Sequence, residues 1–154
     1  MAVSPLETKE YAIEMATPPT QPNKASKVVV GCQDGQRLKG YVFNFSPLRE
    51  VFRLFPEENS PHHLGADVRL EGVKAIFFVK DFAGHREHQD SYDLEKSAHG
   101  RKLEVIFQDG EIIAGTTEAY NPKKVGFFLF PADPESNNLR IFVVNRSVQQ
   151  VKLL

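Results

Sequence analysis

The chain has 154 residues, of which 41% are hydrophobic and 25% charged, a composition typical of one ordinary globular domain or two very small ones. Its net charge of −1 excludes a whole-chain field that recruits nucleic acid or an anionic membrane, but leaves room for a local basic patch. The single cysteine, Cys32, excludes a disulfide within the chain and is typical of a reducing compartment. No signal peptide and no apolar run of about 18 residues is found, so the sequence predicts a cytoplasmic protein.

Residues 1–26 are predicted to form an N-terminal arm. Ser4 and Pro5, followed by Glu7, have the form of a helix start, and a short helix is expected to reach about Met15. Such a helix is too short to be stable alone in water. The proline-rich residues 17–22 must be extended. The arm is therefore either a disordered tail or a segment that docks on a neighbour.

Residues 27–80 and 101–154 are two copies of one pattern, related without a gap by a shift of 75 positions, from Lys27 to Lys102. An internal repeat of this kind decides the architecture. Each copy alone has a thin core, so we expect the copies to lean on one another or on other subunits. Residues 81–100, which are polar and rich in histidine, are predicted to be a linker.

Each copy contains five stretches rich in β-branched and aromatic residues, and these predict five strands per copy. In the first copy they are residues 28–30, 37–45, 51–55, 67–70 and 73–80, and in the second 102–107, 111–120, 125–130, 139–145 and 148–153. An Asp-Gly pair, at 34–35 and again at 109–110, predicts a tight hairpin turn after the first strand. Gly40 and Gly115 predict a bulge or sharp bend inside the second strand.

The spacing of these residues resembles the Sm1 motif of the Sm-like (LSm and Hfq) small-barrel family. In each copy the Asp-Gly pair is followed by the mid-strand glycine and then by an aromatic residue, Phe45 or Tyr120. Residues 73–76 and 148–151 are similar to the Sm2 motif. The resemblance implies an all-β protein of two tandem five-stranded Sm-like or SH3-like small barrels. It also implies RNA binding, and rings in which the fourth strand of one barrel pairs with the fifth of the next.

Departures from the family's pattern fall on the residues that would bind RNA. The family places an aspartate and an asparagine in the loop after the second strand, and an Arg-Gly pair in the Sm2 turn. The aspartate positions here hold Ser46 and Asn121, the asparagine positions hold Glu50 and Val125, and the arginine positions hold Arg69 and Val144. The resemblance therefore implies the scaffold, while most of the uridine-type pocket is missing. Residues 126–133 also resemble an uncharacterised bacterial domain associated with PilZ signalling proteins.

Basic, aromatic and amide residues near the loops form the candidate nucleic-acid-binding site. In a small barrel, the loop after the second strand and the turn after the fourth lie on one rim, which would form a stacking and phosphate-binding surface. The alternative is ordinary solvated lysine and arginine at strand ends, with both aromatic residues in the core, since Glu50 and Glu71 dilute a positive field. The candidates are Phe45, Arg49, Arg69, Tyr120, Asn121, Lys123, Lys124 and Arg146.

No catalytic apparatus is recognisable in the sequence. It has no nucleophile–base–acid set, no glycine-rich phosphate loop and no spaced pair of carboxylates, and we interpret Cys32 as a structural thiol. A zinc site needs three or four ligands that converge from fixed backbone. The residues that suggest one lie in polar loops without cysteine, so we predict no metal, no cofactor and no enzyme activity; they are His62, His63, His85, His88, Asp90, Asp93 and His99.

We therefore expect a non-catalytic binding module of bacterial RNA or signalling regulation, with single-stranded RNA as its first candidate partner. The alternative is a protein-interaction or signalling accessory module that does not bind RNA. For the sheet edges we consider two hypotheses. The halves pair with each other through their fourth and fifth strands in a compact pseudo-symmetric monomer, or the free edges build a homo-oligomer, such as three chains in a ring of six barrels.

Overall fold

The computed structural model describes residues 25–83, 100–133 and 135–154. In this part of the chain the protein is all-β, as predicted, with short 3-10 turns and no α-helix. The predicted N-terminal helix and most of the predicted linker lie outside the described residues. The strands of the first copy are β1 (Ser26–Cys32), β2 (Arg37–Val42), β3 (Val51–Leu54), β4 (Ala66–Arg69) and β5 (Val73–Val79). Those of the second are β6 (Arg101–Phe107), β7 (Ile112–Thr117), β8 (Gly126–Pro131), β9 (Asn138–Val144) and β10 (Val148–Leu153).

All ten predicted strands are present, but the second strand of each copy ends earlier than expected. The backbone of Asn44 has a φ of 51°, and β2 has already ended at Val42. In the second copy, Thr117 is the last residue of β7, and its Oγ1 donates a hydrogen bond to the carbonyl of Phe128 at 2.7 Å. The same oxygen accepts one from the N–H of Ala119 at 3.3 Å, which turns the chain. Polar side chains thus divert the backbone from the ladder at this point.

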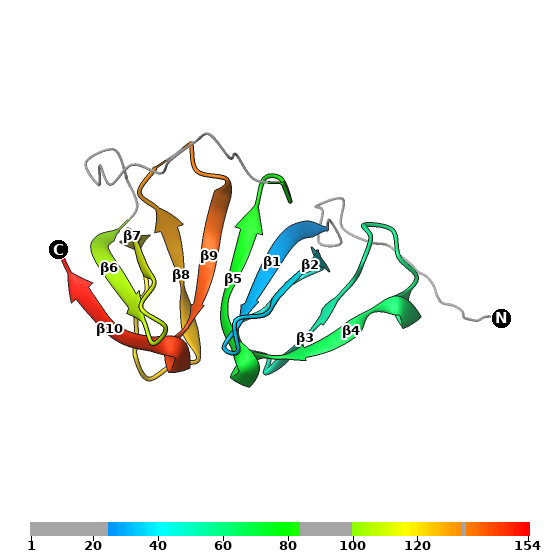
Figure 1. Cartoon of the computed structure of the whole chain (residues 1–154), viewed down its shortest axis with the longest axis horizontal. Coiled ribbons are helices and arrows are strands. Elements are labelled where there is room, and N and C mark those ends of the chain that lie inside the picture. Colours follow the sequence, from blue (N-terminus) through cyan, green and yellow to red (C-terminus); the bar gives the residue numbers. More distant parts are fainter. Residues whose placement is uncertain (1–24, 84–99, 134) are drawn as a thin grey trace, which may run out of the picture.

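The two copies share one antiparallel sheet of eight strands in the order β10-β6-β7-β8-β9-β5-β1-β2 (Figure 1). The ribbon of β3 and β4 is a second sheet, joined to β2 by a single bridge between Tyr41 and Phe55. The copies meet where β5 pairs with β9, in a register that places Ala75 opposite Val143 and Phe77 opposite Ile141. The hypothesis that the halves pair through their fourth and fifth strands is therefore confirmed. The described strands do not form a closed barrel.

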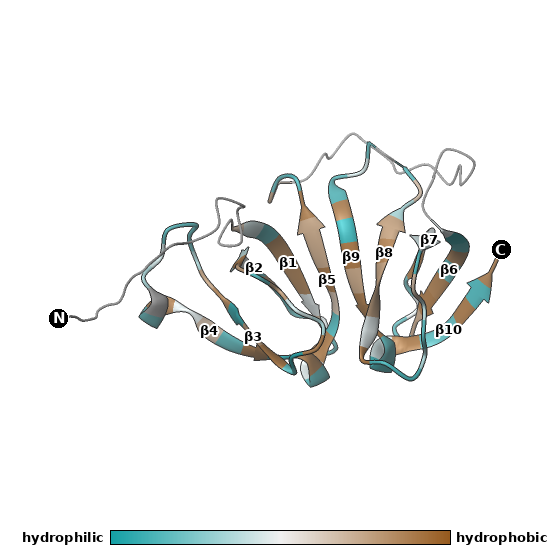
Figure 2. Ribbon diagram, turned by 180° about the vertical axis from the view of Figure 1, so that it is seen from behind, coloured by the Kyte–Doolittle hydropathy of each residue, from teal (hydrophilic) through white to brown (hydrophobic). Residues whose placement is uncertain are grey.

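Every residue of β5 is buried, because this strand separates two cores. On one side, Ile76 and Phe78 pack with Phe142 in the core of the first copy. On the other side, Phe77 packs with Ile141 in the core of the second copy. Figure 2 shows the apolar colour along β5 and β1, and hydrophilic stretches on the outer strands β4 and β10. The expectation that the copies lean on one another is confirmed, and neither core is complete without the junction.

The mid-strand glycines do not mark bulges. The pairing of β2 with β1 runs through Gly40 without a shift in register, and that of β7 with β6 runs through Gly115 in the same way. Glycine is needed at both positions because the backbone that follows, at Phe55 and at Phe130, passes too close to leave room for a side chain. A Cβ on Gly40 would lie 2.6 Å from the carbonyl oxygen of Phe55, and one on Gly115 would collide with that of Phe130.

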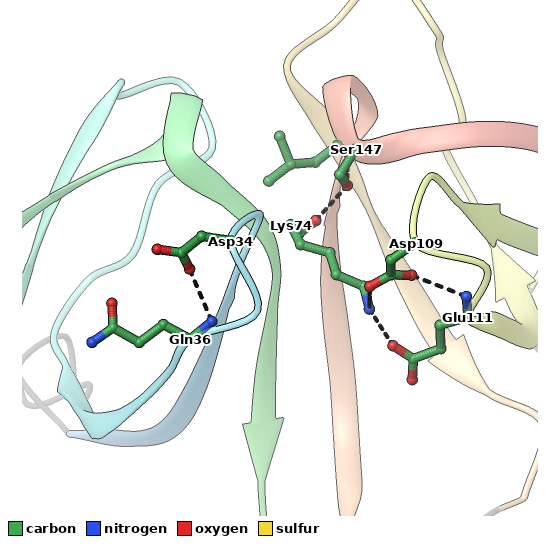
Figure 3. A network of polar contacts seen from close by, with 7 residues as sticks. Asp34, Gln36, Lys74, Asp109, Glu111 and Ser147 are labelled. Carbon is green, nitrogen blue, oxygen red and sulfur yellow. Dashed lines mark hydrogen bonds and ion pairs between the residues drawn. The ribbon is translucent and has the colours of Figure 1, made fainter.

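A buried lysine fastens the junction between the copies (Figure 3). Lys74 lies on β5, and its ammonium group donates a hydrogen bond to Asp109 at 2.7 Å and another to Glu111. Both carboxylates belong to the β6–β7 hairpin of the other copy, and the ammonium lies 4.7 Å from the centre of the Phe107 ring. The Oγ of Ser147 donates to the Lys74 carbonyl at 2.8 Å. The Asp-Gly turn of the second copy therefore also carries an acceptor for the first.

This contact shifts the pKa of both partners. Burial by itself lowers the pKa of Lys74, but the hydrogen bonds and charges of Asp109 and Glu111 outweigh it and raise that pKa above its usual value of 10.5. The hydrogen bond from Lys74 is the main reason that the pKa of Asp109 falls below 3.8. A raised lysine pKa stabilises the fold below 10.5, and a lowered aspartate pKa stabilises it above 3.8. The stabilisation is thus present at neutral pH and is lost as the pH falls through the range below 3.8.

We expect Lys74→Met to lower the free energy of unfolding by about 1 kcal/mol at pH 7, because both carboxylates are partly exposed and solvent screens the pair. At a pH well below 3.8 the difference from the wild type should shrink, because Asp109 loses its charge as the pH falls through its lowered pKa. Urea denaturation at the two pH values measures this. Gln149, which occupies the same position in the second copy and is exposed, provides the control Gln149→Met. An equal loss at both pH values would show that packing, not charge, holds Lys74.

Candidate nucleic-acid interface

Two adjoining pockets lie where the loops of the two copies meet. We call the first, of about 460 Å³, the turn pocket, because the 3-10 turns Leu70–Gly72 and Asn145–Ser147 border it. We call the second, of about 750 Å³, the junction pocket, because residues of both copies line it. The pockets share Lys124 and Val125, from the loop between β7 and β8. Together they make one hollowed surface across the two copies.

Equivalent backbone hydrogen bonds build the turn pocket in both copies. The N–H of Leu70 donates to the carbonyl of Glu50 at 2.9 Å, and the N–H of Asn145 donates to that of Val125 at the same distance. These bonds hold the turn after the fourth strand against the start of the third. The loop after the second strand and the turn after the fourth therefore do meet on one rim, as expected.

The side chain of Asn145 adds a brace in the second copy only, since Leu70 takes its place in the first. Its Nδ2 donates to the carbonyl of Asn121 at 3.0 Å and to that of Lys124 at 2.8 Å. The Oδ1 of Asn121 in turn accepts the N–H of Lys123 at 2.9 Å. The short loop that carries both lysines is thereby held in one shape, with the two lysines exposed.

Acidic and basic side chains both line the turn pocket, so its net charge is small. Arg146 forms an ion pair with Glu71 at 3.9 Å, and both side chains are more than half exposed. Such an exposed pair contributes little to stability. Arg69 and Glu50 add one further charge of each sign to the lining. The excess of positive charge in the turn pocket therefore comes from Lys124 of the β7–β8 loop.

The junction pocket is walled by apolar side chains of both copies. Pro47 and Leu48 come from the loop after β2 in the first copy, and Leu48 is 89% exposed. From the second copy come Tyr120, whose ring packs edge-on against Phe127 at 4.9 Å between centroids, and the half-buried Phe128. Aromatic walls at a pocket mouth suit a flat ring system.

Arg140 lies in this pocket, in the middle of the eight-stranded sheet. The carbon at the centre of its guanidinium group lies 4.5 Å from the ring centroids of Phe78 and Phe128, in a cation–π contact with each. Among the described residues, no carboxylate forms an ion pair with Arg140. Burial lowers the pKa of its guanidinium from the usual value, although arginine stays charged at neutral pH. Glu118 also lines the pocket but, like the other described carboxylates, it does not pair with Arg140.

Residues 24–154 match the model of a family of unknown function, DUF6982. The chain belongs to the DUF6982 family. No curated protein and no solved structure matches it. The family match begins just before β1 and contains both copies. Within the described part of this DUF6982 protein, no helix has the length and apolar character needed to cross a bilayer.

Six of the eight candidate residues line the hollowed surface of this DUF6982 protein. Phe45 does not, because its ring packs among those of Phe52, Phe78, Phe128 and Phe142. Arg49 is exposed on the turn after β2 and lies outside both linings. The six that the structure brings together are Arg69, Lys124 and Arg146 in the turn pocket, and Tyr120, Asn121, Lys123 and again Lys124 in the junction pocket.

Sequence reasoning missed Arg140. The signal was a charged residue inside an otherwise apolar strand, between Leu139 and Ile141, where the repeat places Gly65 in the first copy. A charge in such a position is either paired or functional.

The interpretation of Cys32 as a structural thiol fits its place in the DUF6982 fold. Cys32 is half-buried at the end of β1, and burial, with the charge of Asp34, raises the pKa of its thiol. A raised pKa keeps the group protonated and poorly nucleophilic. No cluster of three potential metal ligands is found among the residues that the structure describes, and residues 85–99 of the histidine-rich set lie outside them.

Proposed function

We propose that this protein is a non-catalytic module that binds single-stranded RNA on the hollowed surface formed by the turn pocket and the junction pocket. The observation that carries the proposal is the convergence of six candidate residues on adjoining pockets. Single-stranded nucleic acid is bound by cations that follow the backbone and by aromatic rings on which bases stack. The lysines of the β7–β8 loop supply the first, and Tyr120 and Phe128 supply the second.

The pairing of β5 with β9 supports the Sm-like interpretation of each copy. It joins the fifth strand of one copy to the fourth strand of the other, which is the pairing that the resemblance implies between neighbouring barrels. We therefore propose two Sm-like units fused side by side within one chain. In this arrangement a strand of RNA crosses the loops of both units.

Fluorescence anisotropy with labelled U-rich and A-rich RNA at 50 mM salt tests the proposal. We expect the triple variant Lys123→Ala, Lys124→Ala, Arg146→Ala to bind at least tenfold more weakly than the wild type. The slope of log affinity against log salt should fall by about 2, because three phosphate contacts to a single strand are lost. No binding by the wild type at this salt concentration would contradict the proposal and leave the protein-interaction alternative.

A matched control separates this surface from net charge. Lys27, Arg101 and Lys152 are exposed and line neither pocket. Their combined replacement by alanine removes the same charge as the triple variant. The control should bind RNA within about twofold of the wild type at 150 mM salt, where distant charges are screened. An equal loss of RNA affinity in both triple variants would show that RNA binding depends only on the net charge of the protein and not on this surface.

Self-association through the edges stays a prediction. β4 and β10 each pair with one strand only among those described, and they correspond by the repeat to β9 and β5, which pair with each other. Unlike these inner strands, the outer ones carry exposed charges, namely Asp67 and Arg69 on β4 and Lys152 on β10. Charged edge strands resist pairing with other chains. We therefore base the proposed function on the pockets rather than on the edges.

A further inference from the structure

The junction pocket exists only because the two copies are fused. The loop after β2 brings Pro47 and Leu48 of the first copy over strands β8 and β9 of the second. The Phe45 ring, just before them, packs on Phe128 and Phe142 at 6.3 and 5.2 Å between centroids and anchors that loop. At about 750 Å³, the volume lies within the roughly 300–1,000 Å³ typical of pockets that enclose a small ligand.

The charges that face this pocket are mainly positive. Arg140 lies among its lining side chains, Lys123 and Lys124 are exposed at its edge, and Glu118 is the acidic residue of the lining. The Arg140 guanidinium lies 4.5 Å from the centres of two aromatic rings and forms no hydrogen bond or ion pair with the described residues, so its N–H groups are available to a ligand. A planar guanidinium of this kind accepts phosphate or carboxylate through two parallel hydrogen bonds.

The uncharged part of the lining is complementary to a flat apolar group. Tyr120, Phe128 and Phe130 are half-buried, so each offers part of a ring to the pocket. Leu48 of the first copy adds an apolar side chain to the lining, and at 89% exposure it has apolar surface that a ligand could bury. An anion alone would leave these walls unused, and an apolar ligand alone would leave Arg140 without a counter-charge.

We propose that the junction pocket holds one nucleotide, with the base between Leu48 and the aromatic walls and the phosphate on Arg140. This inference rests on the proposed function and deepens it, since it names the place where one base leaves the RNA strand. A free nucleoside monophosphate carries the same chemistry and should enter the same pocket.

Isothermal titration calorimetry of the full chain tests this with four probes: 5′-UMP, 5′-AMP, uridine and inorganic phosphate. We expect the two nucleotides to bind at least tenfold more tightly than uridine or phosphate alone, because only they supply both base and charge. Arg140→Leu keeps an apolar side chain against the rings of Phe78 and Phe128. It should weaken nucleotide binding at least tenfold, since it removes a charged hydrogen-bond donor.

A second variant does not depend on the folding of β9. Leu48→Glu changes an exposed loop side chain and places a negative charge at the pocket mouth, and it should weaken nucleotide binding about fivefold or more. The control is Leu139→Ala. Leu139 adjoins Arg140 on β9 but is 57% exposed and does not line the pocket, so binding should not change.

Binding of U-rich RNA by the same variants separates the two proposals. If nucleotides bind in the pocket and RNA does not bind, the pocket assignment stands for a free nucleotide and the proposed function fails. If RNA binds with the expected salt dependence while Arg140→Leu and Leu48→Glu bind RNA and UMP as the wild type does, the proposed function stands and the pocket assignment is overturned. Phosphate that binds as tightly as UMP would also overturn it.

Discussion

Replacing Phe142 with alanine is expected to lower the free energy of unfolding by about 3–5 kcal/mol, the largest effect of any single truncation at the junction. Phe142 is completely buried on β9 and lies opposite Ile76 of β5. Its ring packs against those of Phe45 and Phe128, each 5.2 Å away between centroids. The truncation therefore opens a cavity where the core of the first copy meets the strands of the second.

The loss should appear as a single cooperative transition. Both copies share the wall formed by β5 and β9, so weakening it should destabilise them together. Urea denaturation followed by circular dichroism measures the change, with Leu139→Ala on the same strand as the control. Two separate transitions in the Phe142→Ala variant, or a loss below about 1 kcal/mol, would mean that the copies are independent after all.

The second large effect is expected from Gly115→Ala. The added Cβ would collide with the carbonyl oxygen of Phe130 and lie 3.0 Å from its carbonyl carbon. Backbone atoms cannot rotate away as a side chain does, and Phe130 is tied to β7 by its pairing with Thr116. The strand β8 must then move, so we expect a loss of about 3 kcal/mol or more in the free energy of unfolding.

Gly72→Ala is the matched control for this substitution. A Cβ on Gly72 would have no neighbour within 4 Å, and its backbone does not need a positive φ. Thermal and urea denaturation should place this variant within about 0.5 kcal/mol of the wild type. If Gly115→Ala lowered the free energy of unfolding as little as Gly72→Ala, the close approach of β8 would not be the reason for glycine at position 115.

Local patterns in the sequence were sufficient to predict the strands. The β-branched runs, the Asp-Gly turns and the shift from Lys27 to Lys102 predict all ten, because turn chemistry and strand propensity act over a few residues. Partners of strands are decided over longer distances. The pairing of Phe77 with Ile141 depends on two cores that form together, and no window of neighbouring residues contains that information.

One signal of the junction was nevertheless present. Residues 75–79, Ala-Ile-Phe-Phe-Val, are continuously apolar, which is typical of a strand buried on both faces rather than of one half exposed to water. Lys74 appeared only as part of a motif, although it is the residue whose ammonium joins the copies. For the candidate site, the basic and aromatic loop residues could be predicted from their residue types. Arg140 could not, because its role depends on the rings and the pocket that the folded sheet places around it.

The pairing of β5 with β9 also has a consequence for synthesis of the chain. β5 leaves the ribosome roughly 60 residues before β9, an interval of several seconds at about 5–20 residues per second. During that time its apolar edge has no partner, because the strand that covers it has not yet been translated. Until β9 emerges, that edge is open to pairing with other chains. A truncated transcript that ends before β9 would release a product with a permanently open apolar edge.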